Sequence, residues 1–229
     1  MSLSDLSENK PSGREDAPIN MFQFWDHNPP AEVVSLMSTW QAEPGVNYRL
    51  FNNETAEDYI RERIGLDACM AYRACNVGAM KADFFRYCAL YEEGGVYIDA
   101  DTQNLGGLST LYDPTSKGLF FVRNSKLAND FMIICRPHEY LMQYAIDKAI
   151  QNINQKLSNN VWEVTGPGIL TALYRSEDPE KVRLFEDYVI LPVTEIRKVV
   201  GFKWDLPYKQ DASHWVAYQT EQRSIFKTD

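Results

Sequence analysis

The sequence lacks a long apolar run and an excess of basic residues. No apolar stretch reaches the ~18–20 residues that span a bilayer, and the N-terminus has no signal-peptide core. The net charge of −9 disfavours nucleic acid or an anionic membrane as a partner bound through a basic face. We therefore expect a cytoplasmic protein with no membrane span and no nucleic-acid partner.

Cysteine is also scarce, since the 229 residues include only four, with neither a CxxC pair nor a zinc-type spacing. A chain of this length needs no disulfide framework, so we expect reduced thiols. Cys88 and Cys135 lie in apolar segments and are predicted to be core residues. The cysteines are Cys69, Cys75, Cys88 and Cys135.

The domain organisation follows from composition. Hydrophobic residues make up 45% of the chain and aromatic residues 13%, which excludes a disordered protein. Residues 1–17 are polar, with Pro, Gly and Ser, and are predicted to be a disordered leader or expression remnant. Residues 18–229 show no internal repeat and are predicted to form one domain.

The first third of the chain alternates between strand and helix patterns. Residues 19–25 and 46–51 have strand character, and residues 31–40 carry apolar side chains on one helical face. A further helix, capped by Asn53 or Thr55, is predicted to run to about residue 64. This order predicts an α/β fold with a mostly parallel central sheet flanked by helices, with ligands at the carboxyl ends of the strands.

The later elements are predicted in the same way. A loop region is expected after Asp101, and the aromatic-rich segment from Phe202 to Tyr218 has little regular period. Strands are expected at 118–123, 130–135 and 188–191, and helices at 138–153 and 169–174.

Two carboxylates follow a short apolar strand at residues 96–101. The preceding helix, 80–93, is closed by two glycines. In an extended chain residues i and i+2 face the same side, so Asp99 and Asp101 can converge on one point. Converging carboxylates repel unless one is protonated or a cation lies between them, and oxygen ligands suit Mg²⁺ and Mn²⁺. The alternative interpretation is a solvated turn after the strand.

A second charged pair lies on the helix before this strand. Helical geometry places Asp83 at the border of the apolar stripe, where a partly buried carboxylate needs a partner. Arg86, three residues on, is its neighbour on the same face. An ordinary ion pair on the helix surface remains the alternative.

Together, residues 81–87 and 94–101 resemble glycosyltransferases containing the DXD sugar-binding region. That family, of the family 32 type, includes initiating α-1,6-mannosyltransferases and α-1,4-galactosyltransferases, and the glucosyltransferase domain of clostridial cytotoxins is a more distant relative. The resemblance extends over about residues 22–215 and is tight over 78–102. It implies a GT-A type fold and a nucleotide-diphospho-sugar transferase.

The resemblance also implies roles for the charged residues. Asp99 and Asp101 would bind Mn²⁺ or Mg²⁺ bridging the two phosphates of the donor. Asp83 would accept hydrogen bonds from hydroxyl groups of the donor sugar, and Arg86 would lie beside it toward sugar or phosphate. These four residues form the implied catalytic centre, and Tyr97 would bind the donor at the ribose and metal.

Further positions are implied for the nucleotide and for closure of the site. Trp25, with Phe24, would bind the base, where stacking is worth about 1–3 kcal/mol; a core Trp25 is the alternative. Asn129 matches a family asparagine near sugar or acceptor, and the turn 165–167 matches a structural Thr-Gly-Pro. His214 would be a third ligand of metal or phosphate, or else a capping or core histidine, because relatives continue differently after it.

The predicted function is therefore that of a metal-dependent retaining glycosyltransferase. A hexose would move from a nucleotide-sugar, with a UDP-sugar favoured and a GDP-sugar possible, to a glycan, lipid-linked or protein acceptor. A front-face route is favoured because no isolated Asp or Glu can be assigned as nucleophile. The role would be polysaccharide biosynthesis in a bacterial cytoplasm, and a secreted effector acting on host protein is the alternative.

Two other classes stay open. Phosphatases of the haloacid-dehalogenase type also carry Asp-x-Asp after a strand, but require Thr or Val where this chain has Gln103. A catalytically degenerate module that binds sugar nucleotides is the third hypothesis.

Overall fold

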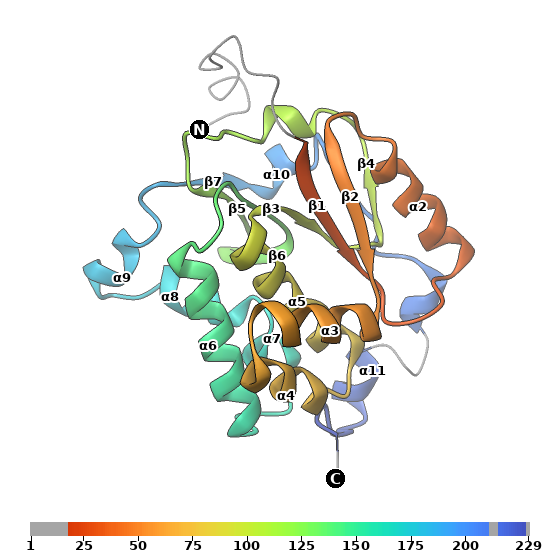
Figure 1. Cartoon of the computed structure of the whole chain (residues 1–229), viewed down its shortest axis with the longest axis vertical. Coiled ribbons are helices and arrows are strands. Elements are labelled where there is room, and N and C mark those ends of the chain that lie inside the picture. The colour runs from red at the N-terminus through yellow and green to blue at the C-terminus, as the bar shows by residue number, and fades with distance from the viewer. Residues whose placement is uncertain (1–17, 211–214, 228–229) are drawn as a thin grey trace.

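The computed structural model describes residues 18–210 and 215–227. Its centre is a six-stranded sheet with the order β2-β1-β3-β6-β5-β7 (Figure 1). Three neighbouring pairs, β1–β2, β1–β3 and β5–β7, are parallel, and β6 runs antiparallel to both β3 and β5. The strands are β1 (Ile19–Phe24), β2 (Val46–Phe51), β3 (Gly95–Ile98), β5 (Gly118–Arg123), β6 (Lys126–Ile134) and β7 (Tyr188–Pro192).

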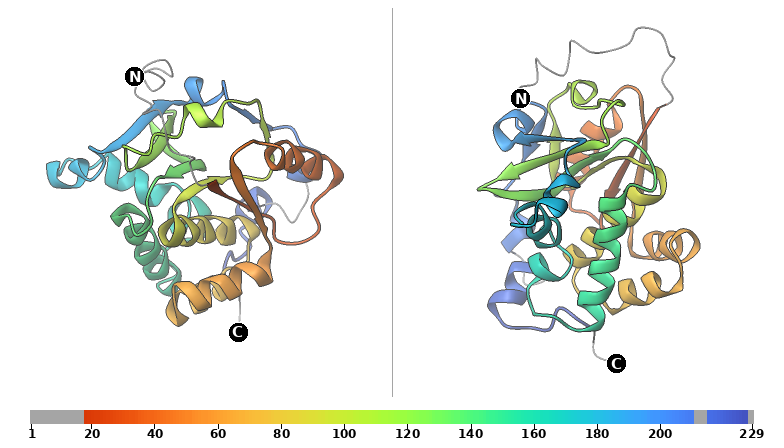
Figure 2. Two further views of the ribbon diagram at one scale, coloured as in Figure 1. Left: turned by 45° about the horizontal axis from the view of Figure 1, so that its top comes forward. Right: turned by 90° about the vertical axis from the view of Figure 1, so that its left-hand side faces the viewer.

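Helices cover both faces of this sheet. The largest group lies along one side, below the sheet in Figure 1, where α5 contacts β1, β3 and β6. The two further views in Figure 2 show the sheet between this group and the elements on the other side. The longer helices are α2 (Ala31–Gln41), α3 (Asn53–Arg63), α4 (Leu66–Ala74), α5 (Gly78–Glu93), α6 (Tyr140–Asn154) and α8 (Gly168–Tyr174), and the shorter ones are α7 (Val161–Val164), α9 (Pro179–Arg183), α10 (Val193–Ile196) and α11 (Trp215–Thr220).

Side-chain alternation along β1 explains why the sheet is buried on both faces. Phe22 and Phe24 enter the larger core cluster with the side chains of α5 and α6. Met21 points to the opposite face and packs in a second cluster with Trp40 of α2. Successive strand residues face opposite sides of a sheet, so an almost continuously apolar strand is the expected sequence of a central strand covered on both faces.

The junction between α5 and β3 places the Asp-x-Asp segment. Gly94 ends α5 with a φ of 63°, and Gly95 follows with a φ of 102°, conformations that side chains strongly disfavour. β3 then runs parallel to β1, with Met21 opposite Val96. The carboxyl ends of β1 and β3 therefore lie at the same edge of the sheet.

Gly95→Ala is expected to destabilise the fold by at least about 3 kcal/mol. A Cβ atom at this position would lie 2.3 Å from the carbonyl oxygen of Asn20, and the backbone φ is also unfavourable. Gly106→Ala is the matched control, since Gly106 has a φ of 90° but no atom within 4 Å of its added Cβ. Urea unfolding should show a cost of about 1 kcal/mol for the control. An equal loss of unfolding free energy in both variants would contradict the close contact between Gly95 and the carbonyl of Asn20.

Most predicted elements are confirmed, with small shifts at their ends. The predicted α/β fold, with a mostly parallel central sheet flanked by helices, is confirmed. The capping residue of α3 is Asn52, whose side chain accepts from the backbone of Glu54 and Thr55, so the predicted caps were one and three residues late. Cys88 is buried as predicted, whereas Cys135 is only half-buried.

The segment after Asp101 contains structure that the sequence pattern does not predict. β4 (Thr102–Asn104) pairs antiparallel with β8 (Val200–Phe202) to form a small second sheet. Strands of three residues are too short to show a period of two, so the sequence pattern cannot predict this pairing. Among the described helices, none is both long enough and apolar enough to cross a membrane.

Candidate active site

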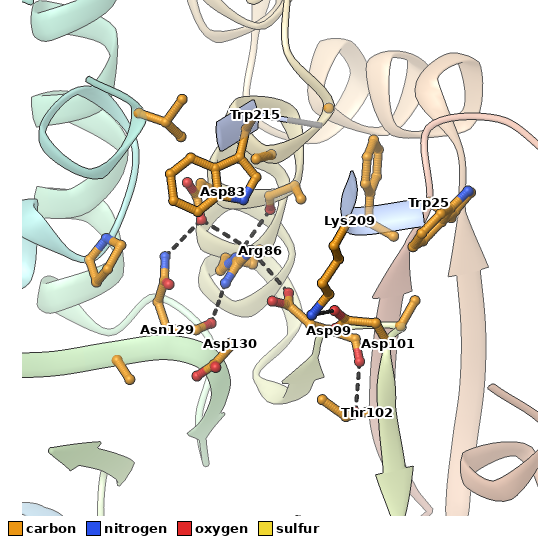
Figure 3. Close-up of a pocket in the computed structure, with 18 of the residues that line it drawn as sticks. Trp25, Asp83, Arg86, Asp99, Asp101, Thr102, Asn129, Asp130, Lys209 and Trp215 are labelled. Atoms are coloured by element: carbon orange, nitrogen blue, oxygen red, sulfur yellow. Dashed lines mark hydrogen bonds and ion pairs between the residues drawn. The ribbon is translucent and has the colours of Figure 1, made fainter. Parts of the chain in front are cut away.

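The strand ends meet at a cavity of about 960 Å³. Trp25 follows β1 and Asp99 follows β3, and both line this cavity. Asn129 lines it from β6 and Asp83 from α5, so four elements contribute (Figure 3). The cavity therefore lies at the edge of the sheet where ligands of α/β proteins bind.

A tight turn presents the two carboxylates of the Asp-x-Asp motif. The backbone N–H and the hydroxyl of Thr102 both donate to the carbonyl of Asp99, at 3.2 Å and 2.7 Å. The indole N–H of Trp40 donates to the hydroxyl and the carbonyl of Thr102, both at 3.1 Å. The fully buried Gln23 donates to the Asp99 carbonyl at 3.4 Å. These bonds hold the turn, so Asp99 and Asp101 lie beside each other in Figure 3.

Arg86 is the centre of the site. One guanidinium nitrogen, Nη2, lies 3.1 Å from Asp83 Oδ1 and 3.1 Å from Asp99 Oδ1. A second nitrogen, Nη1, donates to the backbone carbonyl of Asn129, and the guanidinium lies 4.4 Å from the centroid of the Tyr97 ring. The Arg86 side chain is 4% exposed, so this is a buried network and the surface ion-pair interpretation does not apply. Burial lowers the pKa of Arg86, because it disfavours the charged form. The nearby carboxylates outweigh this effect, Asp99 most strongly, so the pKa of Arg86 lies above its usual value.

Asp83 is held by partners from two further segments. Its Oδ1 accepts from the amide of Asn129 at 2.8 Å, and its Oδ2 accepts from the hydroxyl of Thr165 at 3.3 Å. The Tyr87 hydroxyl in turn donates to the carbonyl of Gly166 at 3.2 Å. Burial raises the pKa of the Asp83 carboxyl, and Arg86 and these hydrogen bonds oppose the rise. Hydrogen bonds from Thr165 and to Gly166 therefore join the Thr-Gly-Pro turn to α5, the helix that carries Asp83.

Asp99 lies between one cation and several carboxylates. Its side chain is 31% exposed. The pKa of Asp99 is raised to about 7, and burial is the largest cause. Arg86 lowers this pKa, whereas the charges of Asp101, Asp130 and Asp83 raise it further. Carboxylates gathered in this way repel one another unless a cation lies between them or one is protonated.

A lysine from the C-terminal part of the chain reaches Asp101. The Nζ atom of Lys209 lies 2.6 Å from Asp101 Oδ2, and the hydroxyl of Tyr208 donates to the same oxygen at 2.8 Å. The Tyr208 ring contacts Trp25 edge to face, with centroids 5.0 Å apart. Asp101 is thus joined to the aromatic end of β1 through the segment that includes Lys209.

The donor set fits a hard divalent cation. Asp99 and Asp101 supply carboxylate oxygens, the ligands that Mg²⁺ and Mn²⁺ prefer. Within residues 18–210 and 215–227, no group of three His, Cys, Asp or Glu side chains is close enough to hold a metal. An ion bound by one or two carboxylates completes its shell with water and substrate phosphates. The two carboxylates therefore suit an ion that is bound together with a diphosphate.

Lys209→Met is expected to tighten Mn²⁺ binding about fivefold in the absence of nucleotide. The ion must displace Nζ from Asp101, and a partly exposed ion pair is worth up to about 1 kcal/mol. Electron paramagnetic resonance of free Mn²⁺ measures this affinity. Lys126→Met is the matched control, because Lys126 also lines the cavity but lies over the Trp162 ring at 4.7 Å. An equal gain in both variants would show only a general effect of charge.

The other predicted residues are placed as follows. Phe24 is buried against Phe85, with centroids 5.9 Å apart, and reaches the cavity wall. Tyr97 is fully buried beneath Arg86, so in this structure it orients Arg86, and contact with a ribose stays a prediction. Trp25 packs with Val33 and lines the cavity. His214 lies outside the described residues.

Several cavity residues were not singled out from the sequence. They lie in segments far from the Asp-x-Asp motif, and lone Lys, Arg and Trp residues carry no motif of their own. The structure adds Arg123, Asp130, Trp162, Trp204, Tyr208 and Lys209.

Comparison with known proteins agrees with this geometry. Residues 19–116 match the family model described as a glycosyltransferase sugar-binding region containing a DXD motif. The initiation-specific alpha-1,6-mannosyltransferase of Candida albicans is 30% identical over 96 residues, which cover 38% of this chain. The match spans only 25% of the length of that relative.

A solved glycosyltransferase structure shares the fold, in agreement with the predicted GT-A type. PaToxG glycosyltransferase superimposes with a TM-score of 0.57 at 20% identity, covering 72% of this chain and 73% of that chain. The ligand-free glycosyltransferase domain of the YGT toxin gives a TM-score of 0.41 at 14% identity, covering 70% and 55% of the two chains.

The predicted resemblance is confirmed, because residues 19–116, which include Asp83, Arg86, Asp99 and Asp101, match the DXD-containing glycosyltransferase sugar-binding region. The predicted enzyme class, glycosyltransferase, agrees with both matches.

Proposed function

We propose that this chain is a metal-dependent, retaining glycosyltransferase that uses a nucleotide-diphosphate sugar. The observation that carries the proposal is the buried Arg86, which joins Asp83 and Asp99 beside Asp101 at one cavity. Asp83 and Arg86 would bind the donor sugar, and Asp99 and Asp101 would hold Mn²⁺ or Mg²⁺. When bound, the ion stabilises the negative charge that develops on the departing diphosphate.

The reaction exchanges one glycosidic bond for another. The bond from the anomeric carbon to the diphosphate oxygen breaks, and a bond from that carbon to the acceptor oxygen forms. The acceptor proton passes to the departing diphosphate. Arg86 is fixed by three oxygen partners and reorganises little during this step, which is the main requirement for electrostatic stabilisation.

Retention by a front-face route is part of the proposal. A double displacement needs a free carboxylate under the anomeric carbon. Asp130 is a further carboxylate of the cavity, but its Oδ2 accepts from Arg123 at 2.7 Å, so its charge is compensated. Asp99 is likewise paired with Arg86, which also disfavours a phosphatase in which it would be the nucleophile.

The proposed donor is a UDP-sugar, bound with its base near Trp25. This aromatic residue lies at the cavity end of β1 and is held edge to face by Tyr208. A GDP-sugar is the second candidate. We propose a cytoplasmic role in polysaccharide biosynthesis, with a secreted effector as the alternative.

A donor screen tests the proposal. UDP-glucose, UDP-galactose, UDP-N-acetylglucosamine and GDP-mannose are incubated with Mn²⁺, and release of nucleotide is measured. We expect turnover of a UDP-sugar that chelation of the metal abolishes, and release of sugar whose anomeric configuration, read by NMR, is retained at early times. An inverted product would refute the front-face route, and no turnover of any donor would favour the binding module.

A further inference from the structure

One wall of the cavity is built from residues that the donor site does not use. Trp204 lines the cavity with 51% of its surface exposed. Its ring is stacked on Phe202, with centroids 5.9 Å apart and an interplanar angle of 26°. The wall therefore offers an aromatic ring that is fixed from one side and still largely open.

A charged pair lies beside this ring. The guanidinium carbon of Arg123 is 4.6 Å from the centroid of Trp204 and 4.8 Å from that of Phe202. Arg123 also pairs with Asp130 Oδ2 at 2.7 Å. Among the described residues, Asp130 Oδ1 and Arg123 Nε are buried and have no hydrogen-bond partner. Buried polar atoms of this kind cost about 1–3 kcal/mol each, so a small rotation of the two side chains that brings these atoms to a ligand is favoured.

This wall is next to the donor site. Asp130 follows Asn129, whose carbonyl accepts from Arg86, and the carbonyl of Asp130 accepts from the backbone N–H of Asp99 at 2.9 Å. On the other side, Lys209 bridges from Asp101 to within 5.5 Å of the Trp204 ring. The wall and the donor residues line the same cavity of about 960 Å³, at the upper end of the ~300–1,000 Å³ usual for ligand pockets.

We propose that Trp204, Arg123 and Asp130 form the acceptor subsite and that it takes a pyranose ring, so that the acceptor is a carbohydrate. The apolar face of the ring packs on Trp204, and adjacent hydroxyl groups donate to Asp130 and accept from Arg123. A paired donor and acceptor at one edge suits vicinal hydroxyl groups better than a single phenol or alkyl hydroxyl. A phosphate group would be repelled by the Asp130 carboxylate. The assignment rests on the proposed transferase function, which supplies the adjacent donor.

Saturation-transfer NMR tests the subsite without knowledge of the true acceptor. The probes are the methyl α-glycosides of glucose, galactose, mannose and N-acetylglucosamine, together with N-acetyltyrosine amide as a phenol, added to the protein with Mn²⁺ and UDP. We expect at least one glycoside to bind and Trp204→Ala to weaken that binding about fivefold, while Trp204→Phe retains it. Asp83→Asn, which alters the donor-sugar pocket, should leave this signal in place.

The controls separate the outcomes. Tyr140→Ala removes an aromatic residue that is 58% exposed and does not line the cavity, and it should change nothing. The proposal is overturned if no glycoside signal depends on Trp204, or if only the phenol depends on it, which would indicate a protein acceptor. It is also overturned if Trp204→Ala weakens UDP binding as strongly as glycoside binding. Absence of UDP binding in the wild type would instead refute the donor site, and glycoside binding would still be measured.

Discussion

Arg86→Met is expected to destabilise the protein by about 3–5 kcal/mol, as removal of one partner from a buried ion pair generally does. The change leaves Asp83 and Asp99 without their shared cation and the carbonyl of Asn129 without a donor. Urea unfolding at neutral pH measures the effect. The loss should be smaller at pH 5 than at pH 8, because burial already raises the pKa of Asp83 and a protonated carboxyl needs no cation.

The control for this prediction is an arginine on the surface. Arg61 pairs with Asp58 at 2.7 Å, but their side chains are 43% and 60% exposed. Arg61→Met should cost less than about 1 kcal/mol, because exposed ion pairs contribute little. If Arg86→Met and Arg61→Met were equally stable, the network around Arg86 would not be the structural centre of the site.

Asp99→Asn is expected to lower the rate of sugar transfer about 10²–10³-fold while the fold persists. The amide oxygen can still accept from Arg86, which lies 3.1 Å from the present carboxylate. The lost negative charge, however, weakens binding of the cation that stabilises the leaving diphosphate, and removal of one such electrostatic contribution has an effect of this size. Release of nucleotide from the best donor measures the rate, and circular dichroism checks the fold.

Asp187→Asn is the matched control for charge. Asp187 pairs with Lys117 at 3.0 Å, its side chain is 68% exposed, and it does not line the cavity. Its rate should equal that of the wild type. A rate for Asp99→Asn within tenfold of the wild type would show that Asp99 is not a ligand of the catalytic ion.

The parts of the site that could be predicted share a local signal. Helical spacing predicts Asp83 beside Arg86, and strand spacing predicts Asp99 beside Asp101. The family resemblance joins the two pairs into one site. The burial of Asp83 went further than expected, because Asn129 and Thr165 satisfy it from distant segments.

The remaining parts depend on contacts that no local pattern encodes. Tyr208 and Asp101 are 107 residues apart in sequence, and their hydrogen bond brings Lys209 to the carboxylate. β4 and β8 are also far apart in sequence, and each is only three residues long. Arg123 lies on the predicted strand at 118–123, but its place in the cavity wall depends on its contacts with Phe202 and Trp204, which come from a distant segment.

Calorimetric titration of UDP and then GDP, each with and without Mn²⁺, on the wild type and on Asp101→Ala tests the central claim most directly. Asp101 is in contact with Lys209 and Tyr208 and adjoins the turn that presents Asp99. The expected result is manganese-dependent binding of UDP to the wild type that is lost in Asp101→Ala. Failure of both nucleotides to bind the wild type, or equal binding by Asp101→Ala, would contradict a metal-dependent nucleotide-sugar site at this carboxylate pair.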